Sequence, residues 1–101
     1  YYIESDADGY LQNCSINKEK ILPNGEMVGI HKLSNTFYKR MCAEYAIIVH
    51  EKPKLGYEYQ LLYMSQHFSP VYVLHVEGLK WYEIDDIQDL RYAEENIIKY
   101  L

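Results

Sequence analysis

Two stretches of helical periodicity, separated by helix-breaking residues, constrain the fold of this 101-residue chain most. Apolar residues recur every three or four positions over residues 37–48 and again over residues 57–68, which predicts two amphipathic helices. Pro53 and Gly56 interrupt the pattern between them, and Pro70 ends the second helix. The two stripes are Phe37, Met41, Tyr45 and Ile48, and Tyr57, Leu61, Met64 and Phe68.

The segments before the helices are typical of strands. Residues 1–5 and 10–16 flank an Asp-Gly pair, which predicts a tight hairpin turn at residues 6–9. After a loop, residues 26–33 predict a third strand that is buried on both faces over its first half. Ser34 or Asn35 is then expected to cap the first helix.

The C-terminal third returns to extended chain and ends in a helix. Residues 71–76, VYVLHV, predict a continuous apolar strand, and residues 77–78 a turn. Residues 79–85 predict a further strand, and residues 87–101 a helix whose apolar side faces the core. The order of three strands, two helices, two strands and one helix predicts the α/β class, with a mixed sheet and flanking helices in a single unit, residues 1–101.

The composition restricts the classes of binding partner and the cellular compartment that we expect. The net charge of -5 and the lack of a basic run argue against binding nucleic acid through its phosphates. No apolar stretch approaches the length needed to span a membrane. Cys14 and Cys42 match no metal or redox spacing, so we expect free, buried thiols and a cytoplasmic, reducing compartment.

The stretch WYEIDDIQDL, residues 81–90, carries most of the candidate chemistry. Asp86 and Asp89 have the spacing of a helix cap, and both acids suit the positive end of the helix dipole. Asp85 is not needed for this cap. Strand alternation places Trp81, Glu83 and Asp85 on one side, and Tyr82 with the core candidate Ile84 on the other.

Asp85 therefore has two interpretations. A carboxylate at the carboxyl end of a strand lies where ligands bind in open α/β sheets, and magnesium prefers such oxygen ligands. The alternative is a second, solvated turn acid. Glu26, directly before a buried strand, is likewise either a strand-edge charge or an acceptor for ligand hydroxyls. Trp81 and the many tyrosines suit either ordinary packing or an aromatic cage for a quaternary ammonium.

Three segments resemble the sugar-phosphate and choline-phosphate nucleotidyltransferases, in the right order along the whole chain. WYEIDDIQDLRYAEENI, residues 81–97, resembles the C-terminal signature of that family. GEMVGIHKLS, residues 25–34, resembles an earlier strand, and YYIESDADGYLQNCSI, residues 1–16, the hairpin before it. The CTP:phosphocholine cytidylyltransferases and their phosphonate-linked relatives are the most similar group.

The resemblance implies a Rossmann-like fold and a reaction. Asp85 matches a magnesium-binding aspartate, and Glu26 matches an acid that contacts the acceptor. Glu83 and Trp81 are the other expected substrate-binding residues. The implied reaction transfers a nucleotidyl group, with CMP from CTP favoured, to phosphocholine, aminoethylphosphonate or a sugar phosphate, and pyrophosphate leaves.

The chain also departs from that family. The glycine-rich nucleotide loop, the lysine that follows it and the first metal-binding aspartate are not in these residues. We therefore expect the C-terminal half of such an enzyme, without the nucleotide-binding half and inactive alone. We also expect it to self-associate, either by pairing of uncovered strand edges or by swapping an element. A non-catalytic α/β binding or interaction module that kept only the fold, and a structural domain whose acids are only caps, are the alternatives.

Overall fold

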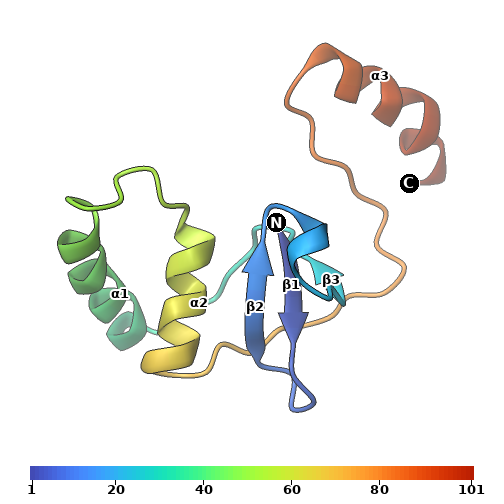
Figure 1. Cartoon of the computed structure of the whole chain (residues 1–101). Coiled ribbons are helices and arrows are strands. Elements are labelled where there is room, and N and C mark those ends of the chain that lie inside the picture. The colour runs from blue at the N-terminus through green and yellow to red at the C-terminus, as the bar shows by residue number, and fades with distance from the viewer.

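A computed structural model describes residues 1–101 and begins with the predicted hairpin (Figure 1). Strand β1 (Tyr2–Ser5) pairs antiparallel with β2 (Leu11–Ser15). In the turn, the Asp6 carboxylate accepts hydrogen bonds from backbone N–H groups two and four residues later, at 2.9 and 3.0 Å. Gly9 has a φ of 89°, which a residue with a side chain adopts only under strain. The hairpin prediction is confirmed.

The third strand is much shorter than predicted. Strand β3 (Gly25–Glu26) pairs antiparallel with β1, which gives the sheet order β2-β1-β3. The Met27 N–H still donates to the Tyr1 carbonyl at 2.8 Å, but Ile30 is 87% exposed. The strand over residues 26–33, buried on both faces, is therefore wrong. Pairing with β1 is recorded as far as the Met27–Tyr1 bond, and residues 28–33 make no ladder with another strand.

The two central helices form as predicted. Helix α1 (Asn35–Ile48) is capped by Ser34, whose hydroxyl accepts from the third residue of the helix at 3.0 Å. Helix α2 (Tyr57–His67) follows Gly56 and ends before Pro70. Figure 1 shows α2 between α1 and the sheet, so α1 packs on α2 and α2 packs on β2.

One serine ties α2 to the sheet. The Ser65 hydroxyl donates to the Leu11 carbonyl at 3.0 Å and accepts from the Val71 N–H at 2.9 Å. The Leu11 N–H donates to the Val71 carbonyl at 2.7 Å, and the Val73 N–H donates to the Gly9 carbonyl at 2.8 Å. The chain after α2 is thus fixed to the hairpin at residues 71–73.

The two later strands do not form. Residues 71–76 make one isolated bridge, between Tyr72 and Tyr10, and Leu74 is 76% exposed. The pairing stops because Val73 already lies opposite Gly9 in the hairpin turn, just before β2 begins. Residues 79–85 are extended but unpaired, and Ile84, predicted for the core, is 51% exposed. The predicted turn at residues 77–78 is confirmed, with Gly78 at a φ of 73°.

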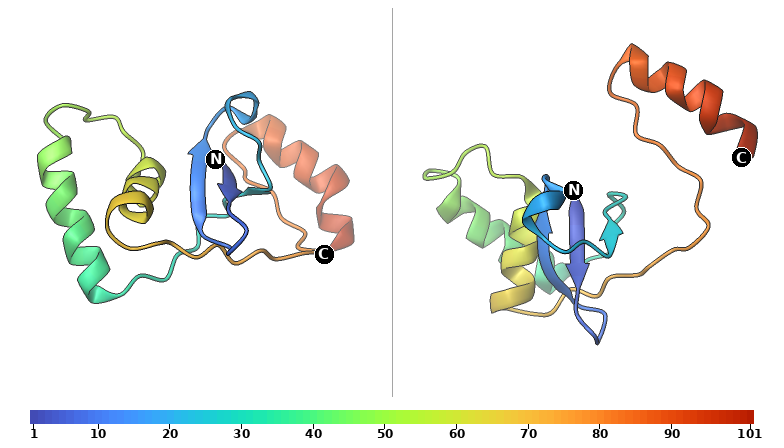
Figure 2. Two further views of the ribbon diagram at one scale, coloured as in Figure 1. Left: turned by 60° about the horizontal axis from the view of Figure 1, so that its bottom comes forward. Right: turned by 45° about the vertical axis from the view of Figure 1, so that its right-hand side comes forward.

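The last helix forms but does not reach the core. Helix α3 (Ile87–Asn96) is followed by a short 3-10 turn, η2 (Ile98–Tyr100), instead of continuing to Leu101. Both views in Figure 2 show α3 at the end of the extended segment, away from α1 and α2. Ala93 is buried, but Ile87 and Leu101 are exposed, so the predicted core-facing side is wrong.

The core therefore lies between the sheet and the two central helices. Six buried side chains form it: Ile3, Leu11, Cys14, Phe37, Leu61 and Met64. The 3-10 turn η1 (Lys18–Lys20) lies in the loop before β3. The chain is of mixed α/β class, with a three-stranded antiparallel sheet and three α-helices. None of these helices has the length and apolar character that crossing a membrane requires.

Candidate functional site

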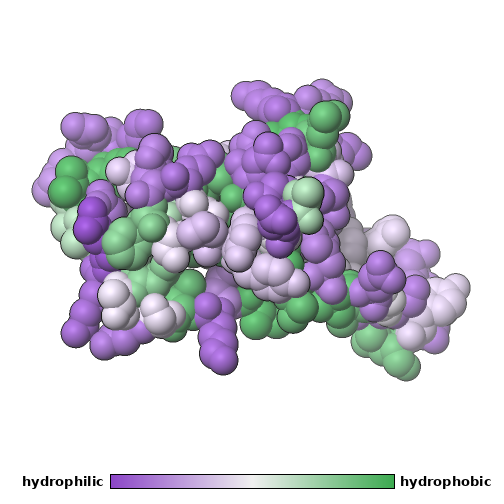
Figure 3. Space-filling view, turned by 90° about the horizontal axis from the view of Figure 1, so that it is seen from below, coloured by the Kyte–Doolittle hydropathy of each residue, from purple (hydrophilic) through white to green (hydrophobic).

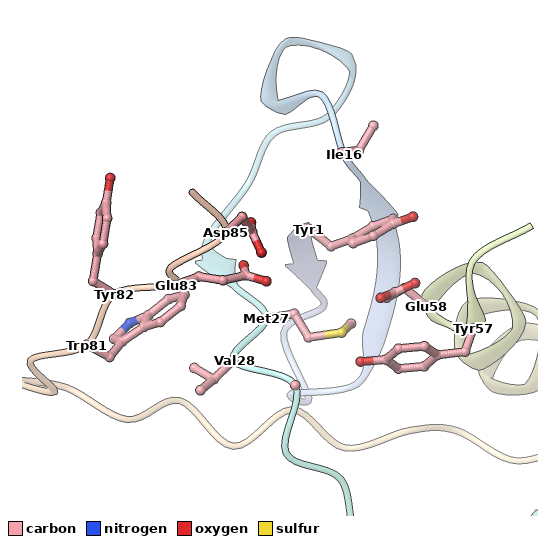
Figure 4. A pocket seen from close by; sticks show the side chains of 11 residues that line it. Tyr1, Ile16, Met27, Val28, Tyr57, Glu58, Trp81, Tyr82, Glu83 and Asp85 are labelled. Atoms are coloured by element: carbon pink, nitrogen blue, oxygen red, sulfur yellow. The ribbon is translucent and has the colours of Figure 1, made fainter. Parts of the chain in front are cut away.

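A cavity of about 570 Å³ lies where three distant parts of the chain meet (Figure 4). Residues 81–85 form one wall, and residues 27–29 lie next to them. Tyr1, directly before β1, and the first turn of α2 form the opposite wall. The cavity therefore brings residues 81–85, which include the candidate metal ligand Asp85, next to the edge of the sheet.

Aromatic side chains form much of the lining. Tyr1, Tyr57 and Trp81 contribute their rings, whereas the ring of Tyr82, which also borders the cavity, points away. The Tyr1 ring meets Tyr59 edge to face, with centroids 5.4 Å apart, and this contact holds it against α2. Burial raises the pKa of both Tyr1 and Tyr57, and the Glu58 carboxylate raises each pKa further. These phenols therefore stay neutral at ordinary pH and present ring faces and hydroxyl groups.

His31 positions one of these rings. Its imidazole lies edge to face with Tyr57, with ring centroids 5.4 Å apart, and its Nε2 is 3.3 Å from the Tyr57 hydroxyl oxygen. Residues 27–31 leave the sheet after β3 and pass the start of α2. The unpaired chain beyond β3 thus fixes the orientation of a cavity residue.

Three carboxylates line the same cavity. Glu83 and Asp85 enter from the extended segment, and Figure 4 shows both side chains pointing toward Tyr1 while Tyr82 points away. This agrees with the predicted alternation of side chains along residues 81–85. Glu58 enters from the first turn of α2. The cavity is therefore acidic on two sides and aromatic between them.

The adjacent aspartates have different surroundings. The Asp86 carboxylate accepts from the Asp89 N–H at 2.8 Å and caps α3, as predicted. The Asp89 carboxylate accepts from the Asp85 N–H at 3.1 Å, so it orders the residue before the cap. The Asp85 carboxylate itself accepts no hydrogen bond within the chain, which leaves its oxygen atoms available to a ligand.

Of the other candidates, Trp81 lines the cavity and Glu26 does not. Glu26 is exposed on β3, opposite Tyr2, and is not part of the cavity lining. The structure therefore brings Trp81, Glu83 and Asp85 together without Glu26. Glu58 could not be predicted as a site residue from the sequence. An acid in the first turn of a helix is already explained by the helix dipole, and the residues around Glu58 give no sign that it lies near Tyr1.

The donor set suits a hard cation that keeps other oxygen ligands. No three His, Cys, Asp or Glu side chains are grouped closely enough to hold a metal ion by themselves. Magnesium is commonly held by one or two carboxylates, with water and substrate phosphates in the remaining positions. Glu83 and Asp85 fit that role, because both are exposed carboxylates on one wall of the cavity.

The two thiols differ from the expectation that both are buried. Cys14 is 3% exposed, and its Sγ donates to the Glu58 carbonyl at 3.6 Å. Burial raises the pKa of the Cys14 thiol to about 11. Cys42, on α1, is exposed, and both cysteines are free.

No family model matches the chain.

Proposed function

We propose that this chain forms the acceptor- and magnesium-binding half of a nucleotidyltransferase. The intact enzyme would transfer a nucleotidyl group, with CMP from CTP favoured, to a phosphomonoester. The observation that carries the proposal is the convergence of Asp85, Glu83 and Trp81 on one cavity, opposite Glu58. The resemblance of residues 81–97 to the C-terminal signature of these enzymes supports it.

The acidic wall would serve the phosphates. Asp85 would hold magnesium through its free carboxylate, and Glu83 would hold the ion or one of its waters. Magnesium, when bound, neutralises charge on the reacting phosphates. The Asp89 carboxylate accepts from the Asp85 N–H at 3.1 Å and so fixes the Asp85 backbone. This bond would orient Asp85 and leave its carboxylate free to bind the ion.

The aromatic wall favours an acceptor with a cationic group. Tyr1, Tyr57 and Trp81 present rings to the cavity, and Glu58 lies beside them. A quaternary ammonium is attracted by aromatic faces, and a nearby carboxylate adds to that attraction. Phosphocholine fits this lining best, aminoethylphosphonate fits it through its ammonium group, and a sugar phosphate offers no cation.

The reaction balances without a further reactant. A phosphate oxygen of the acceptor attacks the α-phosphorus of the nucleoside triphosphate, the bond to the β-phosphate oxygen breaks, and pyrophosphate carries the electron pair away. Such a transfer depends mostly on positioning and charge neutralisation. The triphosphate would be held by a nucleotide-binding half outside residues 1–101.

Trp81 is the only tryptophan, so its fluorescence reports on the cavity directly. Titration with phosphocholine is expected to change the emission saturably, with tighter binding when magnesium is present. Asp85→Asn should remove the magnesium effect. Asp86→Asn is the matched control and should keep it, because asparagine caps a helix about as well as aspartate.

Two outcomes would contradict the proposal. If Asp85→Asn and the parent chain show the same magnesium effect, Asp85 is not a metal ligand. If the 101-residue chain releases pyrophosphate from CTP and phosphocholine at an enzymatic rate, it is not half of an enzyme. Saturable binding that never depends on magnesium would instead favour the non-catalytic binding module.

A further inference from the structure

A serine, an asparagine and a histidine from three distant segments meet near the end of the sheet where the hairpin turn lies. Ser5 is the last residue of β1, Asn24 directly precedes β3, and His75 lies in the extended chain after α2. The Ser5 Oγ lies 3.0 Å from the His75 Nε2 and 3.0 Å from the Asn24 Nδ2. We call these three residues the Ser5 cluster. None of them lines the cavity described above, so the cluster is a separate site.

Asn24 fixes the position of Ser5. The Asn24 Oδ1 accepts from the Ser5 N–H at 2.9 Å, and the Asn24 Nδ2 donates to the Ser5 carbonyl at 3.2 Å as well as to the Ser5 Oγ. The Asn24 N–H donates to the Ile3 carbonyl at 3.0 Å, so the asparagine is itself held by the pairing of β1 with β3. The sheet therefore holds the Ser5 hydroxyl in one place.

The same bonds set the direction of the Ser5 proton. Because the Asn24 Nδ2 can only donate, the Ser5 Oγ accepts from it and keeps its own hydrogen available. The remaining neighbour of that oxygen is the His75 Nε2, which is an acceptor when the neutral ring carries its proton on Nδ1. We assign this tautomer, in which the Ser5 O–H donates to His75.

The imidazole rests against the start of β3 and stays open to solvent. A side-chain carbon at Gly25 would lie 3.3 Å from the His75 Cε1, so the ring occupies space that a larger residue would take. His75 and Asn24 are exposed, and Ser5 is half-buried. Figure 1 shows the hairpin turn at the lower end of the sheet, and Figure 3 views the molecule from that end, where polar and apolar surface alternate. A small molecule can therefore approach the cluster from solvent.

We propose that Ser5 is a nucleophile with His75 as its general base, and that the pair accepts the acyl group of a small reactive ester. A serine hydroxyl within hydrogen-bond distance of an imidazole nitrogen is the arrangement that activates serine for such attack. Since the cluster is exposed, it suits a short acyl group such as acetyl. This activity is independent of the function proposed for the cavity.

The reaction needs only the ester and water. The Ser5 Oγ attacks the ester carbonyl carbon while the His75 Nε2 takes the Ser5 proton. The Asn24 Nδ2 is placed to donate to the carbonyl oxygen as it becomes negative. The bond to the leaving oxygen then breaks, and the alcohol departs with the electron pair and the proton from His75. Water releases the acyl group from Ser5 by the same steps.

Brief exposure to p-nitrophenyl acetate tests the nucleophile, with mass spectrometry to locate the acetyl group. The parent chain should carry acetyl on Ser5, and Ser5→Ala should lack this adduct. His75→Gln should slow acetylation of Ser5 by about 100-fold, which is the order that a general base contributes. Glutamine can keep a hydrogen bond to Ser5 but is too weak a base to take its proton, so this variant separates catalysis from a structural contact.

His50→Gln is the matched control, because His50 is exposed in the turn after α1 and free imidazoles also cleave this ester. This variant should acetylate Ser5 at the parent rate. The parent rate should rise with pH to a plateau, since only a neutral imidazole accepts a proton, and His75→Gln should show no such plateau.

The parent chain unfolded in urea gives a comparison that needs no variant. Unfolding separates Ser5 from His75, so Ser5 should react about 100-fold more slowly than in the folded chain. A folded parent chain without acetyl on Ser5 would overturn the proposal. Equal rates of Ser5 acetylation in the folded and unfolded parent, or in the parent and His75→Gln, would overturn it too.

Discussion

At the scale of single residues, burial decides what a side chain can do chemically. Cys14 and Cys42 are the same residue type, but Cys14 is enclosed between β2 and α2 while Cys42 faces solvent. The thiolate is the reactive form, and a pKa of about 11 keeps Cys14 protonated at neutral pH. Cys14 therefore acts as a small core residue.

The Cys14 thiol predicts how stability depends on alkaline pH. Its pKa is about 11 when folded and near the ordinary value of 9.0 when unfolded. Between these values the unfolded chain binds fewer protons, so the contribution is complete below pH 9 and is lost as pH rises toward 11. Urea midpoints should fall across this window, and should fall less in Cys14→Ala.

The tyrosines provide a control for that measurement. Tyr1 and Tyr57 also have raised pKa values, so they contribute in the same direction in both chains. Because Cys14 also raises the pKa of Tyr1, the difference between Cys14→Ala and the parent measures the thiol together with its effect on Tyr1. Equal slopes for the two chains would show that Cys14 does not hold a raised pKa in the folded state.

The position of a candidate site residue could be predicted from the sequence where neighbouring residues determine it. The Asp86 cap depends on residues three positions apart, and the alternation of Glu83 and Asp85 depends on extended backbone alone. Glu58 could not be found in this way. Its place in the cavity depends on Tyr1, which lies 57 positions earlier and meets α2 only through tertiary packing.

At the scale of elements, helices were predicted better than strands, for a physical reason. A helix forms its hydrogen bonds within itself, so the periodicity and caps of residues 35–48 and 57–67 are sufficient. A strand needs a partner of adequate length. The predicted strands over residues 26–33, 71–76 and 79–85 have the right composition, but residues 28–33 and 74–76 extend beyond the paired segments, and residues 79–85 pair with no strand.

The helices differ in how much they stabilise the fold. Leu61 on α2 is buried in the core, whereas Leu90 on α3 lies outside it. Leu61→Ala should lower the free energy of unfolding by about 2–5 kcal/mol, because it removes buried methyl groups and leaves a cavity. Leu90→Ala should change it by less than about 0.5 kcal/mol in the monomer.

Urea unfolding followed by near-ultraviolet circular dichroism would measure both changes, since this signal reports on packed aromatic rings. Leu90→Ala should be measured at a concentration low enough to keep the chain monomeric. A cost for Leu90→Ala as large as that for Leu61→Ala would mean that α3 is part of the core of its own chain.

At the scale of the whole molecule, the arm formed by the extended residues 74–86 and α3 determines the shape. The radius of gyration is 15.7 Å, against about 13 Å for a compact domain of this length. Only 9 of the 101 residues are buried, and many large apolar side chains are exposed. The hydrophobic core is therefore small, and surface is left for a partner to cover.

The arm also predicts where a protease acts first. Lys80 lies in unpaired, exposed chain, while Lys39 and Arg40 lie within α1. Trypsin needs an extended substrate, so cleavage after Lys80 should precede cleavage after either α1 residue. Mass spectrometry of a short digest should find residues 81–101 released early, and Lys80→Gln should abolish that fragment. Earlier cleavage within α1 would contradict the described packing of α1 on α2.

The bond from Ser65 to Leu11 has a consequence for how the chain folds. It joins residues 54 positions apart, so the core closes only after a long loop has been brought together. Such non-local closure slows folding relative to a helical bundle of the same size. The hairpin and the first helix can form early but have little to bury until α2 arrives. We therefore expect the rate-limiting step of folding to be the closure of α2 onto the hairpin, and we expect α3, which does not reach the core, to take no part in it.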